Sequence, residues 1–245
     1  MPHPIRGSLI RRTLISVTVL FVLAKVQPTQ AQNEPGRLYP ILLNYAKNLY
    51  PEYRKIPEIR RRTIESIADY IYGAIQIDRK SVILIIGTNN STRSILAEAW
   101  CRAAAQYYNV KNIEIYSGGT EVTHVSPYAM KVLENAGFII YKITDDENPR
   151  YEVKYSYNLD PVSLYSKKYN DKEMPAGSYG AIFVCPNADQ NIPYLNAMNF
   201  RASLHYFDPG AYDHTPEQMK KYLQRSHEIS VEMFYLFYCI KNKST

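Results

Sequence analysis

The chain has 245 residues, of which 46% are hydrophobic and 21% are charged. These fractions are typical of a globular protein with a good-sized core, and they exclude a fully disordered or fibrous chain. The formal net charge of +6 would by itself favour an acidic partner such as nucleic acid. The positions of the cations along the chain argue against that partner.

Residues 1–31 have the layout of a secretory signal peptide. A basic head precedes an apolar run over residues 14–24, and small residues follow at Thr29 and Ala31, after which we expect cleavage. The apolar run is shorter than a membrane span requires, although an uncleaved anchor is the alternative. The sequence therefore predicts an exported protein, periplasmic or extracellular, with no stable membrane span after signal cleavage.

Cleavage removes Arg6, Arg11, Arg12 and Lys25 but no acidic residue. Taking four cations from the 29 Lys and Arg, against 23 Asp and Glu, leaves a net charge of +2. We therefore expect no nucleic-acid partner. The three cysteines are odd in number and lack metal-ligand spacing, so we predict no metal site and no cofactor. They are Cys101, Cys185 and Cys239.

Residues 32–78 are predicted to form a helical extension. A short helix over residues 38–50 is stopped by Pro51, and a second helix fits residues 57–77 because its isoleucines and alanines recur at helical spacing. The run of three arginines at 60–62 is interpreted as a solvated face near the start of that second helix, with a binding patch as the alternative.

From residue 79 onward, strand and helix patterns alternate. The run "SVILIIG" (81–87) is rich in β-branched residues, as expected for a strand buried on both faces of a parallel sheet. The last helix is expected to begin at "TPEQ", with Thr215 as N-cap, and to end near residue 240. The other expected elements are helix 94–108, strand 113–119, helix 127–138 closed by Gly137, strand 151–157, a loop over 158–178, strand 179–185 and strand 204–207.

This alternation predicts an α/β three-layer sandwich over residues 79–245, with a mainly parallel four-stranded sheet. A Tyr-rich insertion is expected at about residues 145–178. Ligands of such sheets bind beyond the carboxyl ends of the strands. The segments "GTNNSTR", after the first strand, and "DPG", after the last, are therefore expected at the same edge.

The loop "GTNNSTRS" (87–94) has the composition of a phosphate cradle. Small and polar residues between a strand and a helix can turn their backbone N–H groups toward an anion, and the helix dipole favours the negative charge. An arginine at the end of the loop can hold two phosphate oxygens. A plain strand-to-helix connection is the alternative. The candidate phosphate-binding residues are Thr88, Asn89, Asn90, Ser91, Thr92, Arg93 and Ser94.

From Val82 to the last helix, the chain resembles the low-molecular-weight protein tyrosine phosphatases and the related thioredoxin-coupled arsenate reductases. The resemblance implies a signature C-x-x-x-x-x-R-S at the end of the first strand, in which the cysteine thiolate attacks phosphorus. Counting back from Arg93, Gly87 occupies the cysteine position. The segments that carry the resemblance are "ILIIGTNNSTRSILAEAW", "IEIYSGGTE", "VSPYAMKVLENAGF", "AIFVCPNADQNIP" and "HYFDP".

The resemblance also assigns a role to the late Asp-Pro pair, in which Asp208 matches the general acid that protonates the leaving group. An ordinary Asp-Pro-Gly turn is the alternative, and Asp213 is the fallback for the acid. The reductases need three thiols. Here Gly87 and Ile192 replace two of them and only Cys185 remains, so arsenate reductase activity is not expected.

Three functions are compatible with this pattern. The first is an exported pseudophosphatase, which binds phosphate, another oxyanion or a phosphorylated ligand without turnover because glycine has no nucleophile. The second is an active phosphatase, a hydrolase of phosphomonoesters or phosphotyrosine, that uses another nucleophile. The third is a scaffold with a vestigial site, whose protein partner binds the Tyr-rich extension and insertion. The tyrosines of these added segments are Tyr39, Tyr45, Tyr50, Tyr53, Tyr151, Tyr155, Tyr157, Tyr165 and Tyr169.

Overall fold

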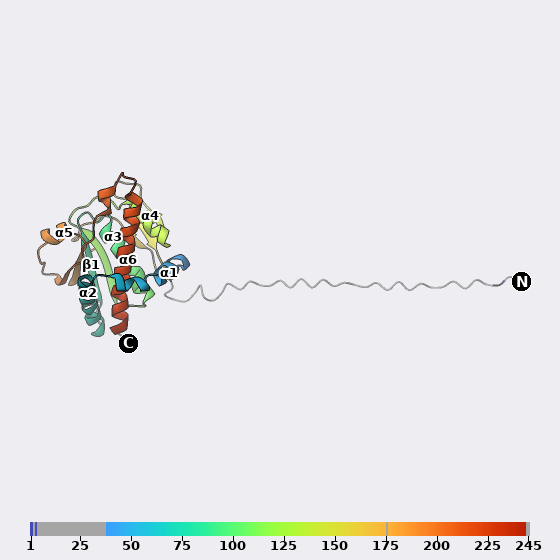
Figure 1. Ribbon diagram of the computed structural model, residues 1–245, viewed down its shortest axis with the longest axis horizontal. Coiled ribbons are helices and arrows are strands. Elements are labelled where there is room, and N and C mark those ends of the chain that lie inside the picture. Colours follow the sequence, from blue (N-terminus) through green and yellow to red (C-terminus); the bar gives the residue numbers. More distant parts are fainter. Residues whose placement is uncertain (2, 4–37, 175, 244–245) are drawn as a thin grey trace. The chain divides into compact units, whose positions relative to one another are not determined.

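The structure is a computed structural model that describes residues 1, 3, 38–174 and 176–243. Residues from 38 onward lie in one compact unit, drawn in colour in Figure 1. The predicted signal peptide at 1–31 lies outside the described residues apart from two isolated positions, so export stays a prediction.

The centre of this unit is a four-stranded sheet in which every pairing is parallel. This confirms the predicted α/β class, and the sheet is wholly rather than mainly parallel. The strand order is β2-β1-β6-β7, with β1 at Ser81–Gly87, β2 at Ile113–Gly119, β6 at Tyr179–Phe183 and β7 at Met198–Ser203.

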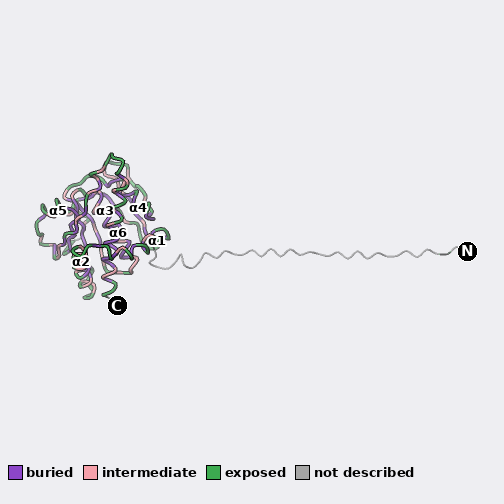
Figure 2. Tube along the Cα trace, in the orientation of Figure 1, coloured by how far each residue is buried: buried purple, intermediate pink, exposed green. Residues whose placement is uncertain are grey.

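Helices cover both faces of the sheet, which gives the three predicted layers (Figure 1). One face packs against α2 (Glu58–Gln76) and α3 (Arg93–Tyr107), and α6 (Gln218–Lys243) packs on these two helices. The other packs against the short α5 (Pro186–Asn191). Successive residues of β1 alternate between the two cores, since strand side chains alternate in direction. Figure 2 shows these buried segments in purple at the centre of the unit.

The N-terminal extension packs on the sheet domain as α1 (Pro40–Lys47), the 3-10 helix η2 (Tyr50–Lys55) and α2. Because it lies in the same compact unit, the domain boundary at residues 78–79 stays a prediction. The interpretation of 60–62 as a solvated face is wrong for Arg60. Its guanidinium binds both carboxylate oxygens of Glu232 in α6, at 2.5 and 2.8 Å.

Helix α4 (Pro127–Ala136) ends as predicted at Gly137, whose φ of 105° is a left-handed conformation that favours glycine. A second, antiparallel sheet of β3 (Ile139–Lys142), β4 (Tyr151–Lys154) and β5 (Val162–Leu164) follows. Strands β3 and β5 were not expected. Both are short edge strands, and their side chains carry too weak an apolar pattern to reveal them.

Two expected elements are displaced in the structure. The last strand covers 198–203, not 204–207, although Leu204 still donates its backbone N–H to Phe183 O at 2.8 Å. Helix α6 begins at residue 218 and continues to 243. The N-cap prediction for Thr215 is wrong, because its hydroxyl donates to the carbonyl of Tyr212 at 2.6 Å.

Candidate functional site

The loop over residues 87–94 lines a cavity of about 470 Å³ at the carboxyl end of β1. All of the predicted phosphate-loop residues line this cavity, together with Gly87 and Asp208. The structure therefore brings the two predicted segments to the same edge of the sheet. The other lining residues are His124, Ser126, Pro127, Tyr128, Gly210, Asp213, His214, Gln218 and Tyr222.

The carbonyl groups of the loop are held by the surrounding segments. Thr88 O accepts from the backbone of Glu121 at 2.9 Å, and Asn89 O accepts from the Ser166 hydroxyl at 2.7 Å. Within the described residues, no backbone N–H of positions 88–94 donates to a protein acceptor. The loop therefore offers these amides, at the N-terminus of α3, to an anion.

Asn90 fixes the shape of the loop. It has a left-handed φ of 47° and is buried, and its side-chain amide donates to Ser94 Oγ at 3.0 Å and Ser117 Oγ at 2.9 Å. Its carbonyl oxygen accepts from the backbone N–H of Lys167 at 3.1 Å. Asparagine tolerates this backbone conformation, and its side chain uses both the amide nitrogen and the carbonyl oxygen in hydrogen bonds that brace the loop.

Arg93 and Asp208 form an ion pair across the cavity. The guanidinium lies 2.5 Å from Asp208 Oδ2 and also donates to the carbonyl of Tyr206 at 3.2 Å. The Arg93 side chain is 15% exposed and that of Asp208 is 47% exposed. The Asp208 carboxylate therefore pairs with the guanidinium group to which an incoming oxyanion would bind. An oxyanion ligand would have to compete with this carboxylate for Arg93.

Gly87 ends β1 at the floor of the loop. A Cβ added there would lie 3.0 Å from Ser94 Oγ and 3.7 Å from a methyl group of Val184. Its φ lies outside the left-handed region, so the backbone at this position suits any residue. Next to it, the Thr88 hydroxyl lies 3.2 Å from the sulfur of the buried Cys185.

The cavity lining also includes Ser126, Gln218 and Tyr222, which the sequence analysis did not find, and Asp213, its fallback acid. The Tyr222 hydroxyl accepts from Ser126 Oγ at 3.1 Å, and burial raises the pKa of this phenol. Asp213 accepts from Gln218 Nε2 at 2.7 Å, so the fallback acid lies in the cavity but does not pair with Arg93. No local pattern marks Ser126 and Tyr222, because they are 96 positions apart and meet only after α4 and α6 have packed.

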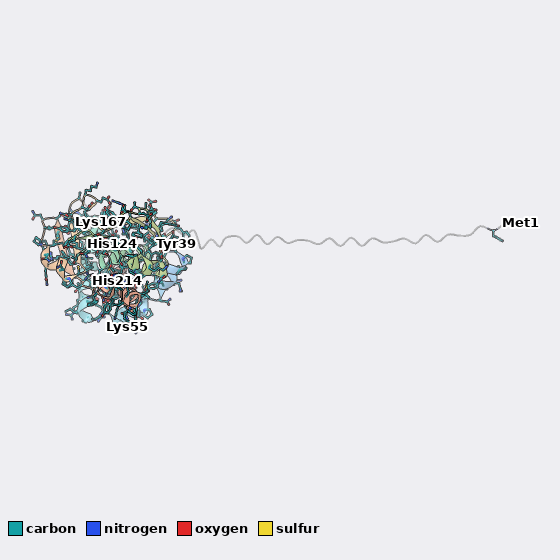
Figure 3. The ribbon with its side chains drawn as sticks, turned by 90° about the horizontal axis from the view of Figure 1, so that it is seen from above. Met1, Tyr39, Lys55, His124, Lys167 and His214 are labelled. Atoms are coloured by element: carbon teal, nitrogen blue, oxygen red, sulfur yellow. The ribbon has the colours of Figure 1, made fainter. Side chains whose placement is uncertain are left out.

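Two histidines at the cavity, His124 and His214, are labelled in Figure 3. Both are exposed, and they come from the segments that precede α4 and α6. Among the described residues, no three His, Cys, Asp or Glu side chains gather closely enough to hold a metal ion.

Comparison with known proteins finds a match to one family model in the first part of the sheet domain. Residues 82–146 match the model of the low molecular weight phosphotyrosine protein phosphatases. The predicted resemblance to this family is thus confirmed over a segment that contains the whole 87–94 loop. Asp208 lies outside the matched residues. No curated protein matches the chain.

Several solved structures resemble the fold at low sequence identity. A low molecular weight phosphotyrosine phosphatase from Vibrio cholerae O395 is 14% identical over 67% of this chain and 99% of its own, with a TM-score of 0.45. One from Bacillus subtilis is 15% identical over 67% and 99%, also with a TM-score of 0.45. An arsenate reductase from Archaeoglobus fulgidus DSM 4304 is 16% identical over 64% and 99%, with a TM-score of 0.42.

Proposed function

We propose that this protein binds phosphate or a phosphorylated ligand in the 87–94 loop without turning it over. The main support is that the backbone N–H groups of the loop have no acceptor within the described chain, and that the same loop carries the Arg93 guanidinium. Gly87 occupies the position at which the family resemblance places the nucleophilic cysteine. The site would then keep its anion-binding chemistry and lack the atom that attacks phosphorus.

The neighbouring hydroxyls do not replace the missing thiolate. The Thr88 hydroxyl is engaged with the thiol of Cys185. Among the described residues, no imidazole or carboxylate is within hydrogen-bond distance of the Ser91 hydroxyl. A hydroxyl needs an adjacent base to become a nucleophile, so neither group supports a covalent route.

Phosphate protection against thermal unfolding tests the proposal. Inorganic phosphate at saturating concentration is expected to raise the unfolding midpoint by about 5 °C, since a ligand that binds only the folded state stabilises it. The Arg93→Ala variant should lose this shift. Arg79→Ala removes an exposed arginine that precedes β1, whereas the loop follows β1 at the other end of the strand, so this variant should keep the shift. Equal protection of wild type and Arg93→Ala would overturn the proposal.

A second candidate is an active phosphatase that uses a bound water, with Asp208 as its acid or base. The position of this carboxylate on the cavity wall favours it. Steady turnover of p-nitrophenyl phosphate by the wild-type protein, lost in Asp208→Ala, would replace the first proposal with this one.

Export is a separate proposal, which rests on the basic, apolar and small-residue segments of residues 1–31. Sequencing the N-terminus of the mature protein from the exporting cell would test it, with cleavage after Ala31 expected. Within the part of the chain that the structure describes, no helix is both long and apolar enough to cross a membrane. The scaffold alternative predicts that a protein partner still binds the Arg93→Ala variant.

A further inference from the structure

Another cavity, of about 430 Å³, lies between the N-terminal extension and α6. No residue lines both this cavity and the phosphate-loop cavity. Its size is within the range of small-molecule sites. The lining residues come from η2, the start of α2 and the second half of α6, and they are Tyr50, Tyr53, Arg54, Arg61, Tyr235 and Tyr238.

Four of the six lining residues are tyrosines whose rings lie against one another. The ring of Tyr50 is centred 5.5 Å from that of Tyr53 and 5.6 Å from that of Tyr238. The rings of Tyr235 and Tyr238 have an interplanar angle of 24°, with centres 6.3 Å apart. Aromatic walls of this kind favour a flat ring in the ligand, because aromatic rings attract one another beyond the effect of burial.

The two buried tyrosines present ring surface to the cavity rather than polar groups. The Tyr53 hydroxyl lies 2.8 Å from that of Tyr108, and the Tyr235 hydroxyl donates to Glu65 Oε1 at 2.6 Å. Neither Tyr108 nor Glu65 lines the cavity. Burial is the main cause that raises the pKa of both Tyr53 and Tyr235, so their phenols stay neutral and add no negative charge to the lining.

The charged groups among the lining residues are the guanidinium groups of Arg54 and Arg61. Arg61 pairs with Glu58, which also accepts from Arg62. The Nε–H of Arg61 is buried and has no acceptor within the described chain. Arg54 is exposed and forms no ion pair with a described residue. The lining therefore holds two cations and no carboxylate.

The surrounding segments do not cancel this positive charge. Between residues 50 and 65 the sequence has five cations and three glutamates, and one of these cations, Arg60, pairs with Glu232 of α6. Four cations thus face three acids. After Glu232, α6 adds two lysines, one of which pairs with Asp69 of α2, and no acidic residue. A ligand with a single negative charge would balance the surplus.

We propose that this cavity binds an aromatic monocarboxylate, whose ring packs against the tyrosines and whose carboxylate is held by Arg54 and Arg61. A planar guanidinium donates two parallel hydrogen bonds to a carboxylate, which fixes its orientation. A neutral aromatic ring lacks the group that the arginines bind. A non-aromatic acid lacks the ring that the tyrosines favour.

Fluorescence titration of the full chain with 2-naphthoate tests the site. Saturable binding is expected, with a loss of affinity of about fivefold in Arg54→Gln. 2-Naphthamide, which has the same ring and no charge, should bind the wild type at least about fivefold more weakly. The adjacent Lys55→Gln is the matched control and should bind as the wild type does, because Lys55 (Figure 3) pairs with Glu52 and does not line the cavity.

The aromatic wall is tested by Tyr50→Leu. Tyr50 is 59% exposed, so the variant should fold as the wild type does, and it should bind 2-naphthoate at least about threefold more weakly. Tyr194→Leu changes a tyrosine of similar exposure, 61%, outside the lining and should leave the affinity unchanged. Equal affinities of the two leucine variants would contradict the role of the tyrosines.

The Arg93→Ala variant distinguishes this cavity from the phosphate loop. Retained binding of 2-naphthoate in this variant supports a separate site. Loss of binding there, with no effect of Arg54→Gln, would overturn the proposal. Absence of saturable binding to the wild type, or equal affinities for 2-naphthoate and 2-naphthamide, would also overturn it.

Discussion

Gly87 is the residue on which turnover depends. A Cβ added there would lie 3.0 Å from Ser94 Oγ, so a side chain fits only if this hydroxyl, which accepts from the Asn90 amide, shifts by a few tenths of an ångström. A cysteine sulfur there would lie beside the hydroxyl of Ser94 and the unpaired amides at the start of α3. These groups stabilise a thiolate and lower its pKa.

We therefore predict that Gly87→Cys creates phosphatase activity toward p-nitrophenyl phosphate. The expected gain is on the order of 100-fold over the wild-type background, because arginine and general-acid candidates are already in the cavity. Gly87→Ala, which adds the Cβ without the sulfur, is the control and should stay inactive. A folded but inert Gly87→Cys protein would mean that more than the nucleophile has been lost.

The ion pair between Arg93 and Asp208 leads to a second prediction at this scale. Asp208→Asn removes the charge that competes with the ligand and should strengthen phosphate binding by about fivefold, since a partly exposed ion pair is worth ~1 kcal/mol. Calorimetry measures the change. Asp213→Asn alters a cavity carboxylate that does not contact Arg93 and should have a smaller effect. Weaker binding by Asp208→Asn would contradict the competition.

At the scale of elements, α2 and α6 are joined by the bidentate pair of Arg60 and Glu232. Glu232 is buried and also accepts from the Tyr206 hydroxyl at 2.6 Å. Burial, followed by the charge of Glu232, raises the pKa of Tyr206 well above its ordinary value, so the phenol stays protonated and donates. Tyr206 in turn offers its carbonyl to Arg93, which connects this pair to the phosphate loop.

Glu232→Gln is therefore expected to destabilise the protein by about 3 kcal/mol, because it leaves the Arg60 charge without its partner. Urea unfolding measures the change. Glu217→Gln, which breaks an exposed pair with Lys220 in the segment leading into α6, should change the free energy of unfolding by less than about 0.5 kcal/mol. Similar stabilities of the two variants would contradict the importance of the buried pair.

For the molecule as a whole, Asp189 couples stability to pH. Burial acts to raise its pKa, but hydrogen bonds from Ser203, Arg201 and His205 outweigh that effect and lower the pKa. A carboxyl group with a lowered pKa stabilises the folded state above its unfolded-state pKa, and this contribution is lost as the pH falls through the folded-state value. Asp189 thus adds to the stability at neutral pH and not in strong acid.

Asp189→Asn should accordingly lower the stability at pH 7 by about 2 kcal/mol, and its stability should fall less steeply than that of the wild type below about pH 5. Chemical unfolding at a series of pH values measures both effects. Asp160→Asn, an exposed position, should follow the wild-type curve. Parallel curves for Asp189→Asn and wild type would contradict the linkage.

The sheet was largely predictable because its inner strands are buried on both faces. Continuous apolar runs mark β1 and β6 without reference to their partners. Strand β4 was expected, but β7 was misplaced and β3 and β5 were missed, since the side chains of these three strands are partly exposed and pairing alone defines them. Helix α6 began later than expected because the Thr215 hydroxyl bonds backward to Tyr212.

The amino-acid sequence by itself determined the α/β class and the phosphate-type loop with glycine at its first position, because a strand, its loop and the next helix are neighbours along the chain. The tertiary structure alone decided that Asp208 pairs with Arg93, and that the backbone N–H of Lys167 donates to Asn90 Oδ1 in the loop. These contacts join residues that are 115 and 77 positions apart in the sequence, so only the packing of the sheet, helices and insertion sets their distances.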